Sequence, residues 1–154
     1  MSQLDCVIYE IPFIESKEIN KFLNLLNLIF PNYNYYQSFF SEFCIKRKSQ
    51  IVYAEVDGVL RGLAIVYVDD EIGKYHMTNF GVHQDYRKKG IGDKILSKIK
   101  QKYSPFVLMV DRSDKQTIEF YQKRGLTPEG CFPNCKEIEE FLLLKYSNRS
   151  IKND

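Results

Sequence analysis

Apolar residues recur along the chain at two spacings, which predict an alternation of strands and helices. Residues 4–12 alternate like a strand that ends at Pro12. Ser16 can cap a following helix that Pro31 stops, because the apolar side chains between them fall on one helical face (Ile19, Phe22, Leu23, Leu26, Ile29 and Phe30). A second stripe from Tyr36 to Cys44 predicts another helix. Two helices are therefore expected early in the chain.

The middle of the chain predicts a hairpin followed by a crossover. Residues 51–68 contain two β-branched runs joined by Asp57-Gly58, a dipeptide typical of tight antiparallel hairpins. Residues 75–83 form a third predicted strand, residues 86–96 begin a helix, and residues 105–110 are a short buried strand. A strand, a helix and a strand in this order indicate a parallel crossover unit.

The last third of the chain predicts one more helix and one more strand. Ser113 and Gln116 resemble a capping box, which would open a helix that runs through Tyr121 and ends at Gly125. Residues 140–146 predict a closing strand, and residues 146–154 a polar C-terminal tail. The predicted fold class is α/β, with a mixed, mostly antiparallel central sheet in a single domain of residues 1–154.

Composition narrows the classes of function. A net charge of +2 is too small to predict nucleic-acid binding, although residues 45–50 and 86–90 concentrate positive charge. No apolar run is long enough to span a membrane and no export signal is visible, so we expect a cytoplasmic protein with reduced cysteines. Cys131 and Cys135 have no second Cys or His pair beside them, so no metal site is expected.

The stretch "RKKGIG", residues 87–92, lies where a strand gives way to a helix. The first N–H groups of a helix have no intrahelical partner and attract anions, and glycine lets a phosphate approach them closely. The alternative is that Gly90 and Gly92 only shape a turn beside solvated cations. The spacing fits neither a dinucleotide fingerprint nor a P-loop, because a third glycine and a G-x-x-x-x-G-K-[ST] pattern are lacking.

Arg87, Gly90 and Gly92 resemble the Arg/Gln-x-x-Gly-x-Gly/Ala motif of the GCN5-related N-acetyltransferase family, which grips the pyrophosphate of coenzyme A. The stretches "NFGVHQDYRKKGIG" and "FYQKRGL" are similar to two segments of that family, and nearly the whole chain agrees with its layout. The resemblance implies splayed fourth and fifth strands that receive acetyl-CoA. The cofactor-binding residues it implies are Phe80, Gly81, Val82, Arg87, Lys88, Lys89, Gly90, Ile91, Gly92, Asp93, Asp114 and Tyr121.

The resemblance also implies roles in the chemistry. The Phe80 N–H would face the thioester oxygen, and Tyr121 would donate a proton to the departing sulfur. His76 stands where one branch of the family has a glutamate base, and an imidazole is mostly neutral at pH 7. It could equally be a strand-surface histidine without a role. Met109 stands where another branch has a glutamate base, and it cannot accept a proton.

Three positions depart from the family pattern: Asp114 stands for a usual Asn, Thr117 for an Ala and Leu126 for a Phe. Asp114 puts in doubt a hydrogen bond that the family's Asn commonly makes near the pantetheine arm. The acceptor pocket is expected to include Tyr33, Tyr35 and Asn79, while the apolar half of residues 32–40 could instead pack in the core.

The leading hypothesis is an acetyl-CoA-dependent N-acetyltransferase that acts on a primary amine of a small molecule, peptide or protein by direct attack in a ternary complex. An alternative is a catalytically silent acyl-CoA sensor or partner domain. A toxin-like enzyme that acetylates aminoacyl-tRNA would need a broad basic surface, which the near-neutral charge argues against. Neither a nucleic acid nor a membrane is expected as a partner, and homodimers are common in the family.

Overall fold

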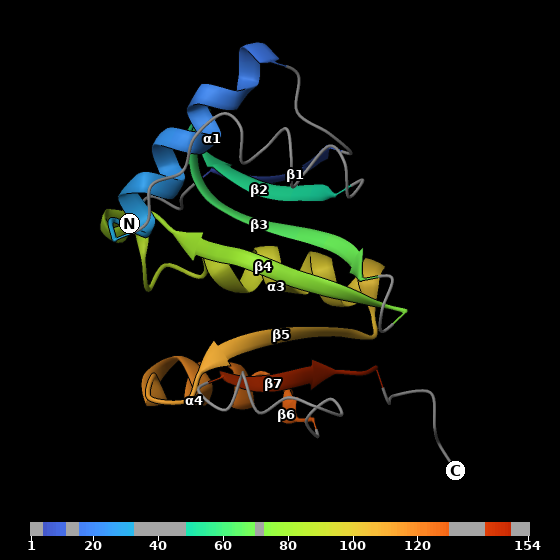
Figure 1. The fold of residues 1–154 in the computed structure, drawn as a ribbon. Helices are drawn as coiled ribbons and strands as arrows, with labels where there is room; N and C mark the ends of the chain where they lie inside the picture. The colour runs from blue at the N-terminus through green and yellow to red at the C-terminus, as the bar shows by residue number, and fades with distance from the viewer. Residues whose placement is uncertain (1–4, 12–15, 33–48, 70–72, 130–140, 149–154) are drawn as a thin grey trace.

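The computed structural model describes residues 5–11, 16–32, 49–69, 73–129 and 141–148 (Figure 1). In chain order the elements are β1 (Cys6–Ile11), α1 (Ser16–Ile29), β2 (Gln50–Val56), β3 (Val59–Asp69), β4 (Lys74–Val82), a 3₁₀ turn (Gln84–Tyr86), α3 (Ile91–Tyr103), β5 (Phe106–Asp111), α4 (Lys115–Gln122), β6 (Thr127–Pro128) and β7 (Phe141–Tyr146). The second early helix predicted over Tyr36–Cys44 lies outside the described residues. Tyr146, the first residue of the predicted tail, is the last residue of β7, and residues 149–154 of the tail lie outside the described residues.

The strands form one mixed sheet in the order β1-β2-β3-β4-β5-β7-β6. Every neighbouring pair is antiparallel except β4 and β5, which run parallel and are joined by α3. The predicted fold class and the predicted crossover are therefore confirmed. The predicted hairpin is confirmed as well, since Asp57 and Gly58 connect β2 to β3 with φ angles of 52° and 81°, the left-handed conformation that such a turn requires.

The two faces of the sheet bury separate apolar clusters. The spacing of apolar residues along α1 presents Ile19, Phe22 and Leu26 to one face, where they pack against the odd-numbered residues of β2 and β3. The larger cluster lies on the opposite face, beneath α3 and α4, and includes Ile95, Leu96 and Tyr121. Figure 1 shows α3 behind the strands. We call the two surfaces the α1 face and the α3 face.

Alternation along the strands decides which face each residue of the central strands meets. Met77 and Val82 of β4 belong to the cluster on the α3 face. His76 is paired in register with Tyr67 of β3, whose neighbour Ile65 packs against α1, so His76 lies on the α1 face. A one-residue irregularity in β4 brings Phe80 onto the α3 face.

Cys6 is a free cysteine, and Cys44, Cys131 and Cys135 lie outside the described residues. None of the helices in the described ranges is both long enough and apolar enough to cross a membrane.

Candidate active site

The parallel strands β4 and β5 stay together over a short distance and then diverge. Only Tyr75 and His76 of β4 are in register with residues of β5 among those the structure describes, namely Phe106 and Val107. Both strands continue in the same direction beyond these pairs, to Val82 and Asp111. Figure 1 shows their arrowheads pointing apart, with α4 beside the end of β5. The carboxyl ends of the two strands therefore border the open end of the sheet.

A bulge in β4 bends the strand where it leaves β5. Between the pairs Leu63↔Gly81 and Ile65↔Thr78, strand β3 contributes one residue and β4 contributes two, Asn79 and Phe80. Asn79 has a φ of 53°, a left-handed conformation that Asn adopts more readily than most residues. Bulges of this kind re-aim neighbouring groups and are frequent next to active sites. The predicted oxyanion donor, the Phe80 N–H, thus belongs to the distorted part of the strand.

The Phe80 ring fills the space between β4 and the two helices of the α3 face. Its centroid lies 6.1 Å from that of Phe120 and 6.0 Å from that of Tyr121, both on α4. A Cβ on Gly92 would lie 3.3 Å from the edge of the Phe80 ring and 3.6 Å from Val82. A side chain at position 92 would therefore crowd the Phe80 ring against the first turn of α3.

The turn before α3, which we call the cradle, is the segment predicted to bind the phosphates of the cofactor. Lys88 and Gly90 have φ angles of 62° and 82°, and α3 begins at Ile91 without a side-chain cap from Gly90. The first N–H groups of the helix are thus left for an external acceptor, and Lys88, Lys89 and Gly90 are exposed around them. These features fit the pyrophosphate of coenzyme A, which would be held by backbone N–H groups and nearby lysines.

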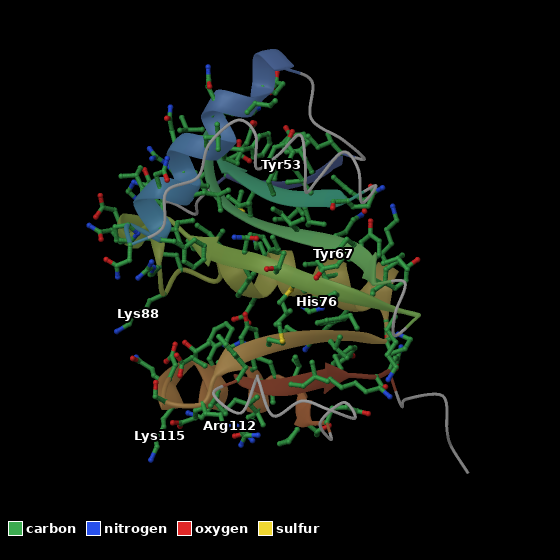
Figure 2. The ribbon with its side chains drawn as sticks, in the orientation of Figure 1. Tyr53, Tyr67, His76, Lys88, Arg112 and Lys115 are labelled. Carbon is green, nitrogen blue, oxygen red and sulfur yellow. The ribbon has the colours of Figure 1, made fainter. Side chains whose placement is uncertain are left out.

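Arg87 and Ile91, both in the predicted cofactor set, make contacts within the protein that limit what each can offer a ligand. The Arg87 Nε donates a hydrogen bond of 3.0 Å to the carbonyl of Val82, so this arginine fastens the turn to the end of β4. The Ile91 side chain is buried in the cluster of the α3 face, which leaves its backbone as the part that can face a ligand. Figure 2 shows Lys88 near the open end of the sheet, with Lys115 and Arg112 below it in the view.

Tyr121 lies on α4 with its ring in the cluster of the α3 face, only 6% exposed. Burial raises the pKa of its phenol well above the ordinary value, and the negative charge of Asp114 raises it further. No hydrogen bond from its hydroxyl to another described residue is found. A phenol in this state is protonated at neutral pH, so its hydroxyl carries the proton that a general acid must donate.

The N-cap of α4 differs from the predicted capping box, which placed it at Ser113. The N-cap is Asp114, whose Oδ1 accepts a hydrogen bond of 3.1 Å from the Thr117 N–H. Ser113 instead donates from its N–H and its hydroxyl to Asp111, at 2.8 and 2.6 Å. The predicted cap was wrong by one residue, because the N–H and the hydroxyl of Ser113 are already bonded to Asp111 in the turn after β5. Asp114 thus acts as a helix cap, while its contact with the cofactor stays a prediction.

The diverging strands β4 and β5 leave a gap between them, which is closed at the end where the two strands are still paired. His76 lies at this closed end, on the opposite face of the sheet from Tyr121. It is 7% exposed and its ring stacks on Tyr67, with centroids 5.0 Å apart and an interplanar angle of 12°. Figure 2 shows the two side chains together near the middle of the sheet. Four residues along a strand span roughly 10–13 Å, so His76 could reach an amine bound near Phe80 only through intervening water. The proposed acceptor residues Tyr33 and Tyr35 lie outside the described residues.

The sequence offered no signal for the ion pair between Asp93 and Arg124, which ties the start of α3 to the end of α4. The two residues are distant in the chain, and only the packing of the helices brings them together. The bulge at Asn79 was missed for a similar reason, because it depends on the register between β3 and β4.

The comparisons with known proteins agree with this geometry. The model of the acetyltransferase (GNAT) family matches residues 19–126. The fold is similar to that of the ribosomal-protein-S18-alanine N-acetyltransferase from Escherichia coli, with a TM-score of 0.70, 16% identity, and 92% of each chain covered.

Two further structures contain the cofactor or an analogue. One is Arabidopsis thaliana Naa50 with the bisubstrate analogue CoA-Ac-MVNAL, at 19% identity and a TM-score of 0.64, with 91% of this chain and 98% of that chain covered. The other is a GNAT family acetyltransferase from Elizabethkingia anophelis with acetyl-CoA bound, at 16% identity and a TM-score of 0.64, with 93% and 98% covered. At these identities the likeness is one of fold.

A sequence comparison with curated proteins finds no match. Since the family model covers more than half of the chain and the strands diverge as the fold requires, the chain belongs to the acetyltransferase (GNAT) family and is an acetyl-CoA-dependent N-acetyltransferase.

Proposed function

We propose that the enzyme transfers the acetyl group directly from acetyl-CoA to a primary amine while both are bound in one ternary complex. The observation that supports the proposal is the divergence of β4 and β5 beyond their two parallel pairs, with α3 starting after the end of β4 and α4, which carries Tyr121, starting after the end of β5. Acetyl-CoA supplies an activated thioester. The chain's own groups then have three tasks: to hold the phosphates, to stabilise negative charge on oxygen, and to move protons.

The residues divide these tasks according to their positions. The first turn of α3 and the exposed lysines beside it hold the pyrophosphate. The Phe80 N–H, in the bulged part of β4, donates to the carbonyl oxygen as negative charge develops there. The amine nitrogen forms a bond to the carbonyl carbon, the carbon–sulfur bond breaks, and the sulfur takes its proton from the Tyr121 hydroxyl. The proton lost by the amine passes through water to His76, on the α1 face.

The acceptor is proposed to bind on the α1 face of β5 and β7. Met109 and Phe141 project from this face and are 46% and 41% exposed, unusually high for apolar side chains in a sheet. Asp111 is the carboxylate at the end of the same strip, and hydrogen bonds from Ser113 hold its pKa below the usual value. These groups favour an amine that carries an apolar substituent, and they disfavour an acidic one.

The test is a coupled measurement of binding and turnover. Calorimetry should detect CoA binding to the wild-type protein, and the release of free thiol from acetyl-CoA should be stimulated by members of an amine panel with matched apolar and acidic substituents. Mass spectrometry should find the acetyl group on the amine nitrogen. CoA binding without turnover across the panel would favour the silent sensor, and the absence of CoA binding would refute both hypotheses.

A further inference from the structure

Arg124 joins the end of α4 to the first turn of α3 through a two-pronged ion pair. Its Nε lies 2.5 Å from Oδ1 of Asp93, and its Nη2 lies 3.3 Å from Oδ2 of the same carboxylate. The third nitrogen, Nη1, donates to the Phe120 carbonyl at 3.0 Å. The guanidinium also lies over the Phe120 ring, 3.7 Å from its centroid. All three nitrogens are thus engaged in one fixed arrangement, which is the geometry that gives arginine pairs their specificity.

Through Phe120, Arg124 is connected to two residues beside the gap between β4 and β5, Tyr121 and Phe80. Phe120, held by Arg124 through its carbonyl and its ring, lies next to Tyr121 in the chain, and the two ring centroids are 5.3 Å apart. Phe120 also contacts the Phe80 ring, which packs beside Gly92 in the first turn of α3. A shift of α4 relative to α3 would therefore move the Tyr121 hydroxyl relative to the bulge of β4.

A second link lies two turns further along α3. The Lys100 ammonium donates to the Arg124 carbonyl at 2.6 Å, and its partial burial lowers the pKa of this lysine. Asp93 and Lys100 are seven residues apart and so lie on the same side of the helix. The end of α4 is thus held at two points, of which the Asp93 link is adjacent to the cradle.

Besides connecting α3 to α4, this link affects the electrostatics of the cradle, because Asp93 carries a negative charge. The carboxylate of Asp93 lies in the first turn of α3, where it interacts favourably with the helix dipole. The same charge would repel a phosphate bound at the N–H groups of that turn. The hydrogen bond from Arg124 holds the pKa of Asp93 below its usual value and raises that of Arg124, so both groups stay charged at neutral pH. Arg124 therefore cancels a negative charge at the edge of the anion site.

We propose that the Asp93–Arg124 ion pair is a positioning device with two effects: it sets Tyr121 against the gap, and it keeps the cradle receptive to the phosphates of acetyl-CoA. The inference rests on the proposed function of the cradle and of Tyr121. Its two effects can be separated, because each partner of the pair contributes differently to them. Removing either partner breaks the tether, whereas only the loss of Arg124 leaves Asp93 uncompensated.

The experiment compares Asp93→Asn, Arg124→Gln and the double variant by calorimetry with CoA and by steady-state kinetics with a confirmed amine acceptor. Arg124→Gln should weaken CoA binding about fivefold, the scale expected for one uncompensated, solvent-exposed like charge beside the phosphates. Asp93→Asn keeps the backbone N–H at this position of the predicted cofactor set and removes only the negative charge, so it should bind CoA as tightly as the wild type or more tightly; the double variant should regain wild-type affinity. All three should lose about tenfold or more in kcat, because small displacements of a catalytic group cost that much.

The control is Lys123→Gln, which removes a cation from the same helix end and breaks only the ion pair to Glu119 within α4. It should leave both the Kd for CoA and kcat close to wild type. Exposed ion pairs contribute little to stability, so all variants should fold, and thermal unfolding checks this. Equal weakening of CoA binding in Asp93→Asn and Arg124→Gln, or an unchanged kcat in both, would overturn the inference. Failure of the wild-type protein to bind CoA would instead refute the proposed function itself.

Discussion

Replacing Tyr121 by Phe removes one hydroxyl and keeps the ring that packs in the cluster of the α3 face. The contacts of the ring with Phe80 and Phe120 need no oxygen, and no described residue loses a hydrogen bond to the hydroxyl. Stability should therefore change by less than about 1 kcal/mol, the scale of a single hydrogen bond. CoA affinity should also be unchanged, because the cradle belongs to α3 and the turn before it.

The effect on the chemical step should be large. Without the phenol the thiolate departs unprotonated, and the loss of general acid catalysis typically lowers a rate about 10²–10⁴-fold. At 1.36 kcal/mol for each factor of ten, this corresponds to about 3–5 kcal/mol in the activation barrier. Burial keeps the pKa of Tyr121 above that of an ordinary phenol. The wild-type rate should consequently show no loss through ionisation of Tyr121 as the pH rises to about 10, the ordinary phenol value.

The assay is kcat with a confirmed amine acceptor, together with CoA calorimetry and thermal unfolding on the same samples. Tyr103→Phe is a matched control, since Tyr103 is a buried tyrosine of the same cluster whose hydroxyl bonds to Glu10, away from the gap. The control should lose some stability and keep its kcat. If Tyr121→Phe turned over at the wild-type rate while chemistry is rate-limiting, Tyr121 would be a packing residue and the proton would come from water.

Three further substitutions test other parts of the site and of the fold. Gly92→Val should weaken CoA binding at least tenfold by calorimetry, because its side chain would meet Phe80 and obstruct the phosphates; wild-type affinity would refute the cradle. His76→Gln should lower the rate and abolish the acidic limb of the pH profile, because the amide has no imidazole whose protonation removes an acceptor lone pair; an unchanged pH profile would assign the proton to water alone. Gly81→Ala should destabilise the fold by about 1–3 kcal/mol in chemical denaturation, since the new Cβ would lie 2.5 Å from the Ile29 side chain; a loss below about 0.3 kcal/mol would show that the end of α1 yields freely.

The agreement between sequence and structure is best where local patterns decide the outcome. The apolar stripe of α1, the Asp57-Gly58 hairpin and the β4–α3–β5 crossover follow from periodicity and from turn residues, whose effects reach only a few positions along the chain. The capping box predicted at Ser113 was wrong at the same local level. The turn after β5 binds the Ser113 N–H and hydroxyl to Asp111, and Asp114, which was not predicted as a cap, takes the N-cap position.

The sequence by itself determined the fold class, the family and the glycine turn before α3, because these depend on patterns and spacings within individual segments. Only the tertiary structure decided how the site is assembled. The register between β3 and β4 sets the bulge at Asn79 and thereby the faces on which His76 and Phe80 lie. The packing of α4 on α3 brings Arg124 to Asp93 across 31 positions of the chain. Such contacts depend on the relative placement of whole elements, which residue spacing along one segment does not encode.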